Sequence, residues 1–232
     1  MIHWLRPDEP FPPVTAALAD PNGLLAASGE LSAVRLIDAY RHGIFPWFSP
    51  GQPVLWWSPD PRMVLMPHEL KVSRSLRKAL RRRDYEVRAD TCFRAVMQAC
   101  AEPRPEQGGT WISAGMIAAY CALHEQGLAH SIETWIDGEL AGGLYGVALG
   151  RMFYGESMFT HAAGASKIAL VHLVRQIERW HFGMIDCQLH TRHLASLGAR
   201  EIPRADFMRK LQELVDYPGV TGHWELDDDL AQ

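Results

Sequence analysis

One stretch of the chain, residues 130–189, constrains the possible folds most. Three apolar runs in it are typical of strands in an antiparallel meander, and Asp137-Gly138 between the first two is a hairpin turn. A long helix over Ala165–Trp180 and a buried strand over Met184–Leu189 follow. This order, with helices before and after it, indicates an α+β domain on a mixed, largely antiparallel sheet flanked by helices.

Apolar periodicity places further elements around the meander. The third meander strand is expected over Met152–Gly155. The other expected elements are a helix opened by Ser73, a strand over Tyr85–Ala89, helices marked by Phe93–Cys100 and Met116–Leu123, and a last helix over Pro203–Tyr217.

The first sixty residues have a different character. They are rich in proline, glycine and tryptophan, with one convincing helix that is capped by Ser32 and ended by Gly43. The aromatic and proline-rich strings at 43–50 and 56–62 predict a rigid, irregular surface without regular elements. We therefore expect a small N-terminal domain over residues 1–62 and a second domain over residues 63–232.

Composition excludes several classes of protein. Of the 232 residues, 47% are hydrophobic and 22% charged, which argues against a disordered chain or a coiled coil. No apolar run approaches the roughly 20 residues of a membrane-spanning helix, and the first residues lack the apolar centre of a signal peptide. Four cysteines without CxxC spacing indicate reduced thiols, so we expect a cytoplasmic protein.

Positive charge is concentrated in one segment. Residues 71–94 hold nine basic and three acidic side chains, a net charge of +6, so the rest of this chain of net charge −4 carries −10. Such a patch favours a polyanionic partner that reaches one face of the protein. A solvated helix face is the alternative. The basic residues expected to contact the polyanion are Arg74, Arg77, Lys78, Arg81, Arg82 and Arg83.

Asp186 and Gln188 are the first candidates for catalysis. Alternate residues of a strand share a face, which would place these two side chains together and Cys187 opposite. A carboxylate beside an amide carbonyl can orient an amine nucleophile and accept its proton. A hydrogen-bonded structural pair is the alternative. Glu156, on a turn with Gly155 at an expected strand end, is a third candidate because functional residues gather there, although this position alone favours a merely solvated turn residue.

The histidines raise the question of a metal. Cys187, His190 and His193 match no established zinc spacing, and Cys187 is expected to face away from Asp186. We expect no metal and no cofactor.

Trp47 and Trp111 lie in polar or proline-rich loops. An indole ring there can stack on a base, although most aromatic residues pack in the core. With the basic segment, these rings favour single-stranded RNA or an RNA end over duplex DNA.

The order of elements is that of the acyltransferase fold that usually binds acetyl-CoA. The pyrophosphate-binding signature of that fold, a basic residue or glutamine before a Gly-x-Gly/Ala turn, is absent from the sequence between Gly155 and Ser166. This argues against a CoA thioester as the donor. A CoA-dependent N-acetyltransferase is nevertheless the second candidate, and an RNA-binding module without chemistry is the third.

Nine strings of the sequence are shared with one family: Asn22-Gly-Leu-Leu-Ala, Ala39-Tyr-Arg-His-Gly-Ile-Phe-Pro-Trp47-Phe, Trp56-Trp-Ser-Pro-Asp-Pro-Arg62, Gly109-Thr-Trp111-Ile, His130-Ser-Ile-Glu, Gly155-Glu-Ser-Met-Phe, Ala165-Ser-Lys167, Ile185-Asp-Cys-Gln188 and Ala195-Ser-Leu-Gly-Ala199. Over about residues 20–208 the chain resembles the leucyl/phenylalanyl-tRNA–protein transferases. The resemblance implies a small N-terminal domain on an acyltransferase-like (GNAT-like) domain, without a cofactor.

It also implies that leucine or phenylalanine, with methionine as a further candidate, moves from tRNA to the α-amine of a protein that begins with Arg or Lys, marking that protein for degradation. By position, Gln188 would orient the amine and draw its proton, Asp186 would polarise Gln188 or hold the acceptor, and Glu156 would bind the incoming amino group or the ribose end. Trp47 and Trp111 would hold the terminal adenosine. The side-chain pocket would be lined by Leu144, Phe153, Gly155, Leu170, Leu173 and Ile177.

The chain departs from the family in two places. Leu173 and Ile177 stand where the resemblance implies aromatic residues, which leaves the side-chain preference open. The acidic C-terminal tail, with Glu225 and Asp227–Asp229, matches no known family role.

Overall fold

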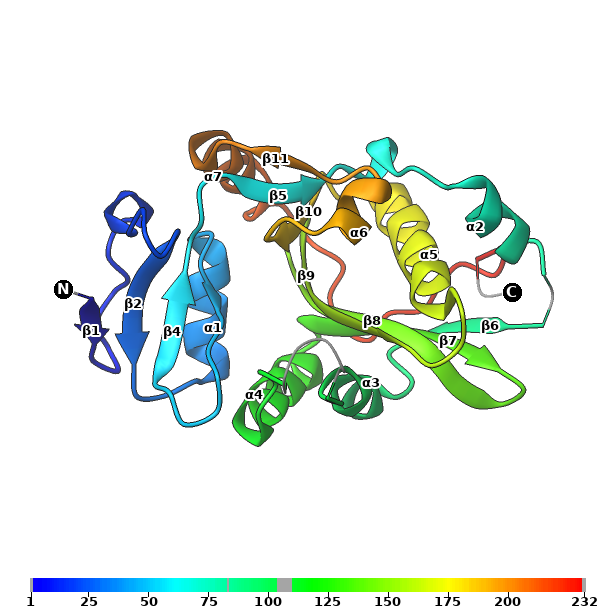
Figure 1. Cartoon of the computed structure of the whole chain (residues 1–232), viewed down its shortest axis with the longest axis horizontal. Coiled ribbons are helices and arrows are strands. Elements are labelled where there is room, and N and C mark those ends of the chain that lie inside the picture. The colour runs from blue at the N-terminus through cyan, green and yellow to red at the C-terminus, as the bar shows by residue number, and fades with distance from the viewer. Residues whose placement is uncertain (1, 83, 104–109, 231–232) are drawn as a thin grey trace.

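The computed structural model describes residues 2–82, 84–103 and 110–230 and arranges their strands in two sheets (Figure 1). The smaller sheet has the order β1 (His3–Leu5), β2 (Leu24–Ser28), β4 (Val54–Trp57), β3 (Phe45–Pro46). The larger sheet has the order β11 (Arg200–Ile202), β5 (Arg62–Leu65), β10 (Met184–Gln188), β9 (Met152–Thr160), β8 (Glu139–Leu149), β7 (Ala129–Ile136), β6 (Glu86–Ala89).

Helices cover both faces of the larger sheet. On one side lie α3 (Phe93–Cys100) and α4 (Ala114–Glu125), and on the other lies α5 (Ala165–Arg179) (Figure 1). The remaining helices are α1 (Ala33–Arg41), α2 (Arg74–Ala79), α6 (Arg192–Ser196) and α7 (Arg204–Leu214), with short 3-10 turns at Val14–Ala16 and Pro67–Glu69. None of the helices in the described ranges is long and apolar enough to cross a membrane.

The larger sheet confirms the predicted fold class. Strands β9 and β10 are parallel, and every other neighbouring pair of this sheet is antiparallel. This is the predicted mixed, largely antiparallel sheet flanked by helices, accompanied by a smaller N-terminal sheet.

Local signals in the sequence explain several element boundaries. The Oγ of Ser32 accepts a hydrogen bond from the Arg35 backbone N–H at the start of α1, and Ser73 caps α2 in the same way. Asp137 and Gly138, with φ of 51° and 79°, join β7 to β8 in the left-handed conformation that two-residue hairpins favour.

The prediction of an irregular N-terminal surface is wrong. The strings from Gly43 to Arg62 contain β3, β4 and the start of β5. Trp56 is fully buried in β4, and its Nε1–H donates to the Ser28 Oγ at 2.9 Å. Aromatic residues suit a half-buried pleated surface, and Pro46 is tolerated because β3 is an edge strand.

One other expectation needs correction, and two elements were missed. Strand β9 continues to Thr160, so Glu156 lies inside a strand rather than on a turn at its end. Helix α6 and strand β11 were not predicted, because both are short and carry little periodicity.

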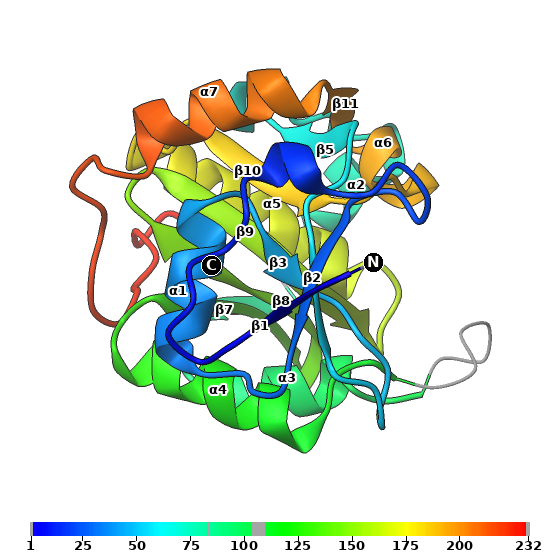
Figure 2. The same cartoon turned by 90° about the vertical axis from the view of Figure 1, so that its left-hand side faces the viewer.

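Two apolar clusters hold these layers together. One, on the side of α3 and α4, also contains residues of the smaller sheet and of α1 and α7, among them Trp56, Tyr40 and Phe207. Figure 2, viewed from the side of the smaller sheet, shows α1 and α7. The other, on the side of α5, contains Phe153 and Trp224. Because residues before and after Arg62 share the first cluster, the division into two domains at this residue stays a prediction.

A buried ion pair joins two neighbouring strands of the larger sheet, close to the smaller sheet. Arg62, the first residue of β5, and Asp186 of β10 both have side chains with 0% exposure. The Arg62 Nε donates to Asp186 Oδ1 at 2.8 Å, and Nη2 donates to Oδ2 at 2.6 Å. The guanidinium also lies 4.7 Å from the Phe45 ring and 4.6 Å from the Phe207 ring. One side chain thus connects β5, β10, β3 and α7.

Replacing Arg62 with Met should destabilise the protein strongly. The carboxylate of Asp186 would stay buried without its cation, a change that costs about 3–5 kcal/mol. Urea unfolding measures the loss. The matched control is Arg200→Met on β11 of the same sheet, which breaks the more exposed pair with Glu69 of the nearby 3-10 turn and should cost less than about 1 kcal/mol. Equal losses in the two variants would contradict the structural role of Arg62.

Candidate active site

A cavity of about 750 Å³ lies where the smaller sheet, the larger sheet and α5 meet, a volume in the usual range of small-molecule sites. Its walls come from β3, the end of α3, β8, β9, α5, β10 and α6. The parallel pairing of β9 and β10 runs from Met152–Met184 to Tyr154–Asp186. Glu156 and Gln188 stand just beyond this last pair, and both line the cavity.

Irregularities in the strands direct both side chains. In the β8–β9 ladder, Tyr145 pairs with Ser157 and Gly146 with Gly155, so Glu156 is an extra residue without a partner. In the β5–β10 ladder, Cys187 is the extra residue, and Gln188 after it has φ of +63°. Such bulges re-aim side chains near active sites.

The carboxylate of Glu156 is the centre of a polar cluster. Its Oε1 accepts hydrogen bonds from the Tyr40 hydroxyl at 2.7 Å and from Gln188 Nε2 at 2.8 Å, and its Oε2 accepts one from the Tyr120 hydroxyl at 3.0 Å. Burial raises the pKa of Glu156 to about 7 despite these hydrogen bonds, and the negative charge of Asp186 acts in the same direction. Glu156 therefore changes charge near neutral pH.

Gln188 is held from two sides. Its backbone N–H donates to Asp186 Oδ1 at 2.9 Å, and its side-chain Nε2 donates to Glu156. Because the amide nitrogen faces the carboxylate, the amide oxygen is the free end of the side chain. This leaves an acceptor for the N–H of a bound amine.

The expectation that Asp186 and Gln188 share one face is wrong. The bulge at Cys187 breaks the alternation, so Ile185, Cys187 and Gln188 line the cavity, whereas Asp186 is fully buried against Arg62. Asp186 therefore reaches Gln188 through the backbone N–H and does not touch the cavity.

Beside this polar cluster lies an apolar recess. Of the residues predicted for the side-chain pocket, Leu144, Phe153, Gly155, Leu170 and Leu173 line the cavity. Ile177 is fully buried in the same apolar cluster but is not among the lining residues.

Trp47 and Trp111 also line the cavity. Trp47 is 43% exposed, and its ring lies 5.6 Å from that of Trp57, whose Nε1–H donates to the Trp47 carbonyl. Trp111 is half-buried.

The basic side chains expected to bind RNA lie away from the cavity lining. Arg74, Arg77, Lys78, Arg81 and Arg82 are exposed on and after α2, which lies beside α5 (Figure 1). Arg82 forms an ion pair with Asp84. Arg83 lies outside the described residues.

The histidines considered as metal ligands do not gather. His190 is exposed, whereas His193 and Cys187 line the cavity. In the described part of the chain, the group of metal-capable side chains that comes together is Asp90, His124 and His223.

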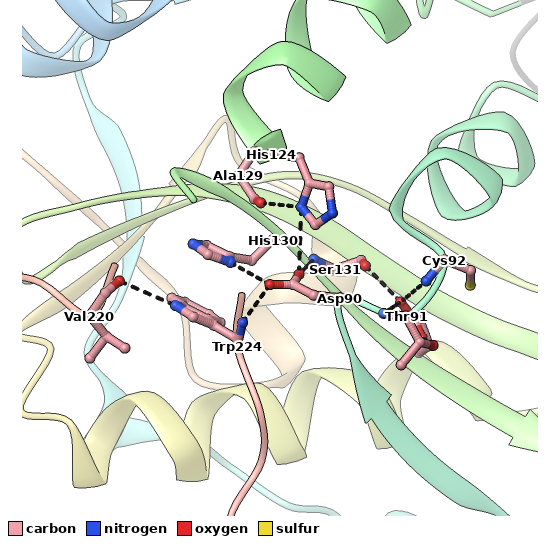
Figure 3. A network of polar contacts seen from close by, with 10 residues as sticks. Asp90, Thr91, Cys92, His124, Ala129, His130, Ser131, Val220 and Trp224 are labelled. Atoms are coloured by element: carbon pink, nitrogen blue, oxygen red, sulfur yellow. Dashed lines mark hydrogen bonds and ion pairs between the residues drawn. The ribbon is translucent and has the colours of Figure 1, made fainter. Parts of the chain in front are cut away.

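Two of these residues, Asp90 and His124, already have structural partners (Figure 3). The Asp90 carboxylate accepts hydrogen bonds from the Ser131 and Trp224 backbone N–H groups and pairs with His130 Nδ1, while His124 Nδ1 bonds to the Ala129 carbonyl. These hydrogen bonds explain why Asp90 and His124 lie close together without a metal ion.

Sequence reasoning missed Tyr40 and Tyr120. Their hydroxyls lie 2.5 Å apart and both bind Glu156. Each is on the apolar side of a helix and looks like a core residue. The available signal was the hydroxyl itself, which needs a hydrogen-bond partner when buried.

The fold defines this chain as an α+β protein whose cavity carries a hydrogen-bonded carboxylate and amide. Residues 64–212 match the sequence model of the family described as leucyl/phenylalanyl-tRNA protein transferase, and residues 29–60 match that of its N-terminal domain. Leucyl/phenylalanyl-tRNA–protein transferases from Nitrosomonas europaea and Nitrosospira multiformis are each 64% identical to this chain. The alignments cover 98% of this chain and 96% of the first relative, and 100% of both chains for the second.

The chain belongs to the leucyl/phenylalanyl-tRNA–protein transferase family and is an aminoacyltransferase. The CoA-dependent alternative is not favoured.

Solved structures are more distant. A GCN5-related N-acetyltransferase from Kribbella flavida has a TM-score of 0.35 at 9% identity, over 71% of this chain and 58% of that chain. For L-PGS from Bacillus licheniformis the TM-score is 0.38 at 11% identity, over 87% and 64%. This chain thus spans less than two thirds of either.

Replacing Glu156 with Gln should change how stability depends on pH. A carboxyl whose pKa is raised on folding stabilises the native state fully below the unfolded pKa, and this contribution is lost as pH rises through the folded pKa. The free energy of unfolding of the wild type, relative to the Gln variant, should therefore fall between about pH 4.5 and pH 7 and then level off. Urea unfolding across this range tests it, with exposed Glu213→Gln as the control. A constant difference would show that Glu156 keeps an ordinary pKa.

Proposed function

We propose that this chain moves leucine or phenylalanine, with methionine as a further donor, from aminoacyl-tRNA to the N-terminal α-amine of a protein beginning with Arg or Lys. The observation that carries the proposal is the Gln188–Glu156 pair, which lies between an apolar recess and an aromatic wall in one cavity. The product is marked for degradation, and the reaction takes place in the cytoplasm, where aminoacyl-tRNA is made and used.

The cavity offers a place for each part of the donor. The apolar recess around Phe153 and Leu170 suits the transferred side chain, and the accessible rings of Trp47 and Trp111 suit the terminal adenosine. The exposed basic residues of α2 supply the positive face for the acceptor stem. We retain the division into a domain over 1–62 and an aminoacyl-transfer domain over 63–232, with Trp47 contributed by the first.

The reaction is aminolysis of an ester. The amine nitrogen attacks the ester carbonyl carbon, the C–N bond forms, the bond to the ribose 3′ oxygen breaks, and one amine proton ends on that oxygen. An α-amine has a pKa of about 7.7–8.0, so a useful fraction is neutral at working pH. The Gln188 oxygen accepts a hydrogen bond from the amine and directs its lone pair to the carbonyl.

The other polar residues keep Gln188 in place. Ionised Glu156 accepts from Nε2 and so turns the amide oxygen toward the amine, while Tyr40 and Tyr120 hold Glu156. Asp186 fixes the backbone of Gln188 and is a positioning residue in this scheme. Glu156 also lines the cavity beside Gln188, so its carboxylate can bind the amino group of the donor.

The direct test combines leucyl-tRNA or phenylalanyl-tRNA with a peptide that begins with Arg. We expect a product longer by one leucine or phenylalanine, identified by mass. No product between pH 7 and 9 would overturn the proposal.

Replacing Gln188 with Ala should lower kcat more than it changes the KM for the donor. An oriented acceptor acts mainly in the transition state, where such losses run from about 10²- to 10⁴-fold, and the lower end is expected because substrate positioning is retained. Steady-state kinetics with both substrates measures the split. Exposed Gln212→Ala is the matched control. A near-wild-type kcat would make Gln188 a structural residue.

Reversing the charge of Arg77 and Arg81 to Glu should weaken tRNA binding. Each lost phosphate contact lowers the slope of log affinity against log salt by about 0.7–0.9. Transfer from a minimal aminoacyl-adenosine donor, which has no acceptor stem, should stay normal. The matched charge reversal at Arg209 and Lys210 on α7 is the control for net charge. Equal losses with both donors would show that the basic face supports the fold and does not contact tRNA.

A further inference from the structure

The chain after α7 turns back and packs on the larger sheet (red in Figure 1). We call residues 218–230 the C-terminal strap. It lies outside residues 64–212, which match the family model, and it contains the acidic residues for which the sequence indicated no role. The strap passes beside α5, the helix that contributes Leu170 and Leu173 to the cavity.

Polar contacts fasten the strap to α5. His172 Nδ1 bonds to the Leu230 carbonyl at 2.6 Å, and the Asp227 backbone N–H donates to the buried Gln176 Oε1 at 2.8 Å. Arg179 forms ion pairs with Asp227 and Asp229 at 2.7 and 2.6 Å. The acidic tail is therefore part of the packed structure along one side of α5.

Trp224 is the apolar anchor of the strap. It is 1% exposed, and its ring stacks on His130 with centroids 3.8 Å apart and planes 6° apart. Its backbone N–H donates to Asp90 Oδ2 at 2.7 Å (Figure 3). The rings of Trp180 and Phe182 pack around it at 5.0 and 5.9 Å. This ring is held in one position by stacking, edge contacts and its backbone.

The same ring supports a wall of the cavity. The Phe153 ring lies 5.9 Å from that of Trp224, and Phe153 lines the cavity whereas Trp224 does not. Trp224 thus stands behind Phe153. On another side, a Cβ at Gly146 would come within 2.5 Å of the Phe153 ring, so the ring lies close over the backbone of β8. Phe153 has little room to move away from a bound side chain.

We propose that Trp224 is a positioning residue that sets the depth of the side-chain pocket through Phe153, and thereby the preference between leucine and phenylalanine. The inference rests on the proposed function. With Trp224 in place the Phe153 wall is fixed. With a smaller ring behind it, Phe153 can retreat, and the enlarged pocket accommodates the bulkier phenylalanine better.

The first test is Trp224→Phe, with leucyl- and phenylalanyl-adenosine as minimal donors. The ratio of kcat/KM for the phenylalanyl donor to that for the leucyl donor should rise by about three- to tenfold, because apolar pockets discriminate modestly between side chains. The matched control is Trp135→Phe, at a half-buried position on β7 outside the cavity lining, which should keep the wild-type ratio. An unchanged ratio, or a shift toward leucine, in folded Trp224→Phe protein overturns the inference.

The second test uses the wild type and decides the matter if the variant does not fold. If the strap shapes the pocket, a bound ligand must stabilise the strap in return. A stable, amide-linked phenylalanyl-adenosine analogue should slow hydrogen exchange at the Trp224 and Asp227 backbone N–H groups. Unchanged exchange at a saturating concentration overturns the inference. Absence of transfer from either aminoacyl-tRNA by the wild type instead overturns the proposed function.

Discussion

A buried carboxylate that must be neutralised organises much of this molecule. Asp186 has no access to water, and Arg62 supplies its counter-charge from the first residue of β5. Because the Arg62 guanidinium also packs between Phe45 and Phe207, the smaller sheet and α7 gather around the same point. Asp186 Oδ1 also accepts the Gln188 backbone N–H, so the ion pair that joins β5 to β10 also fixes the strand end from which Gln188 enters the cavity.

The polar centre of the site results from two interruptions of regular pairing. Glu156 and Gln188 come from adjacent strands, each at an irregularity in a ladder, and they meet where the parallel pairing of β9 and β10 ends. Burial gives Glu156 a pKa of about 7, and the two tyrosine hydroxyls favour its charged form. Glu156 in turn accepts a hydrogen bond from Gln188 Nε2 and so orients the Gln188 amide.

Local signals predicted local structure. The caps at Ser32 and Ser73, the Asp137-Gly138 turn and the long apolar face of α5 depend on residues within one or two turns of chain, and the structure confirms them. The elements that were missed depend on distant partners. Trp56 lies in a strand because β2 and β3 pair with β4, and β11 exists because β5 is beside it. Short strands have little periodicity, so their pairing partners decide their structure.

The sequence by itself determined the fold class, the family and several of the residues that line the cavity, because these depend on residue types and their order. Only the tertiary structure decided which of them act together. Alternation along the strand predicted that Asp186 and Gln188 share one face. One extra residue, Cys187, reverses the face of the residues that follow it. Tyr40 and Tyr120, 80 residues apart, meet at Glu156, and Trp224 reaches Phe153 from the chain end. Such partnerships depend on which surfaces pack together, and no local pattern contains that information.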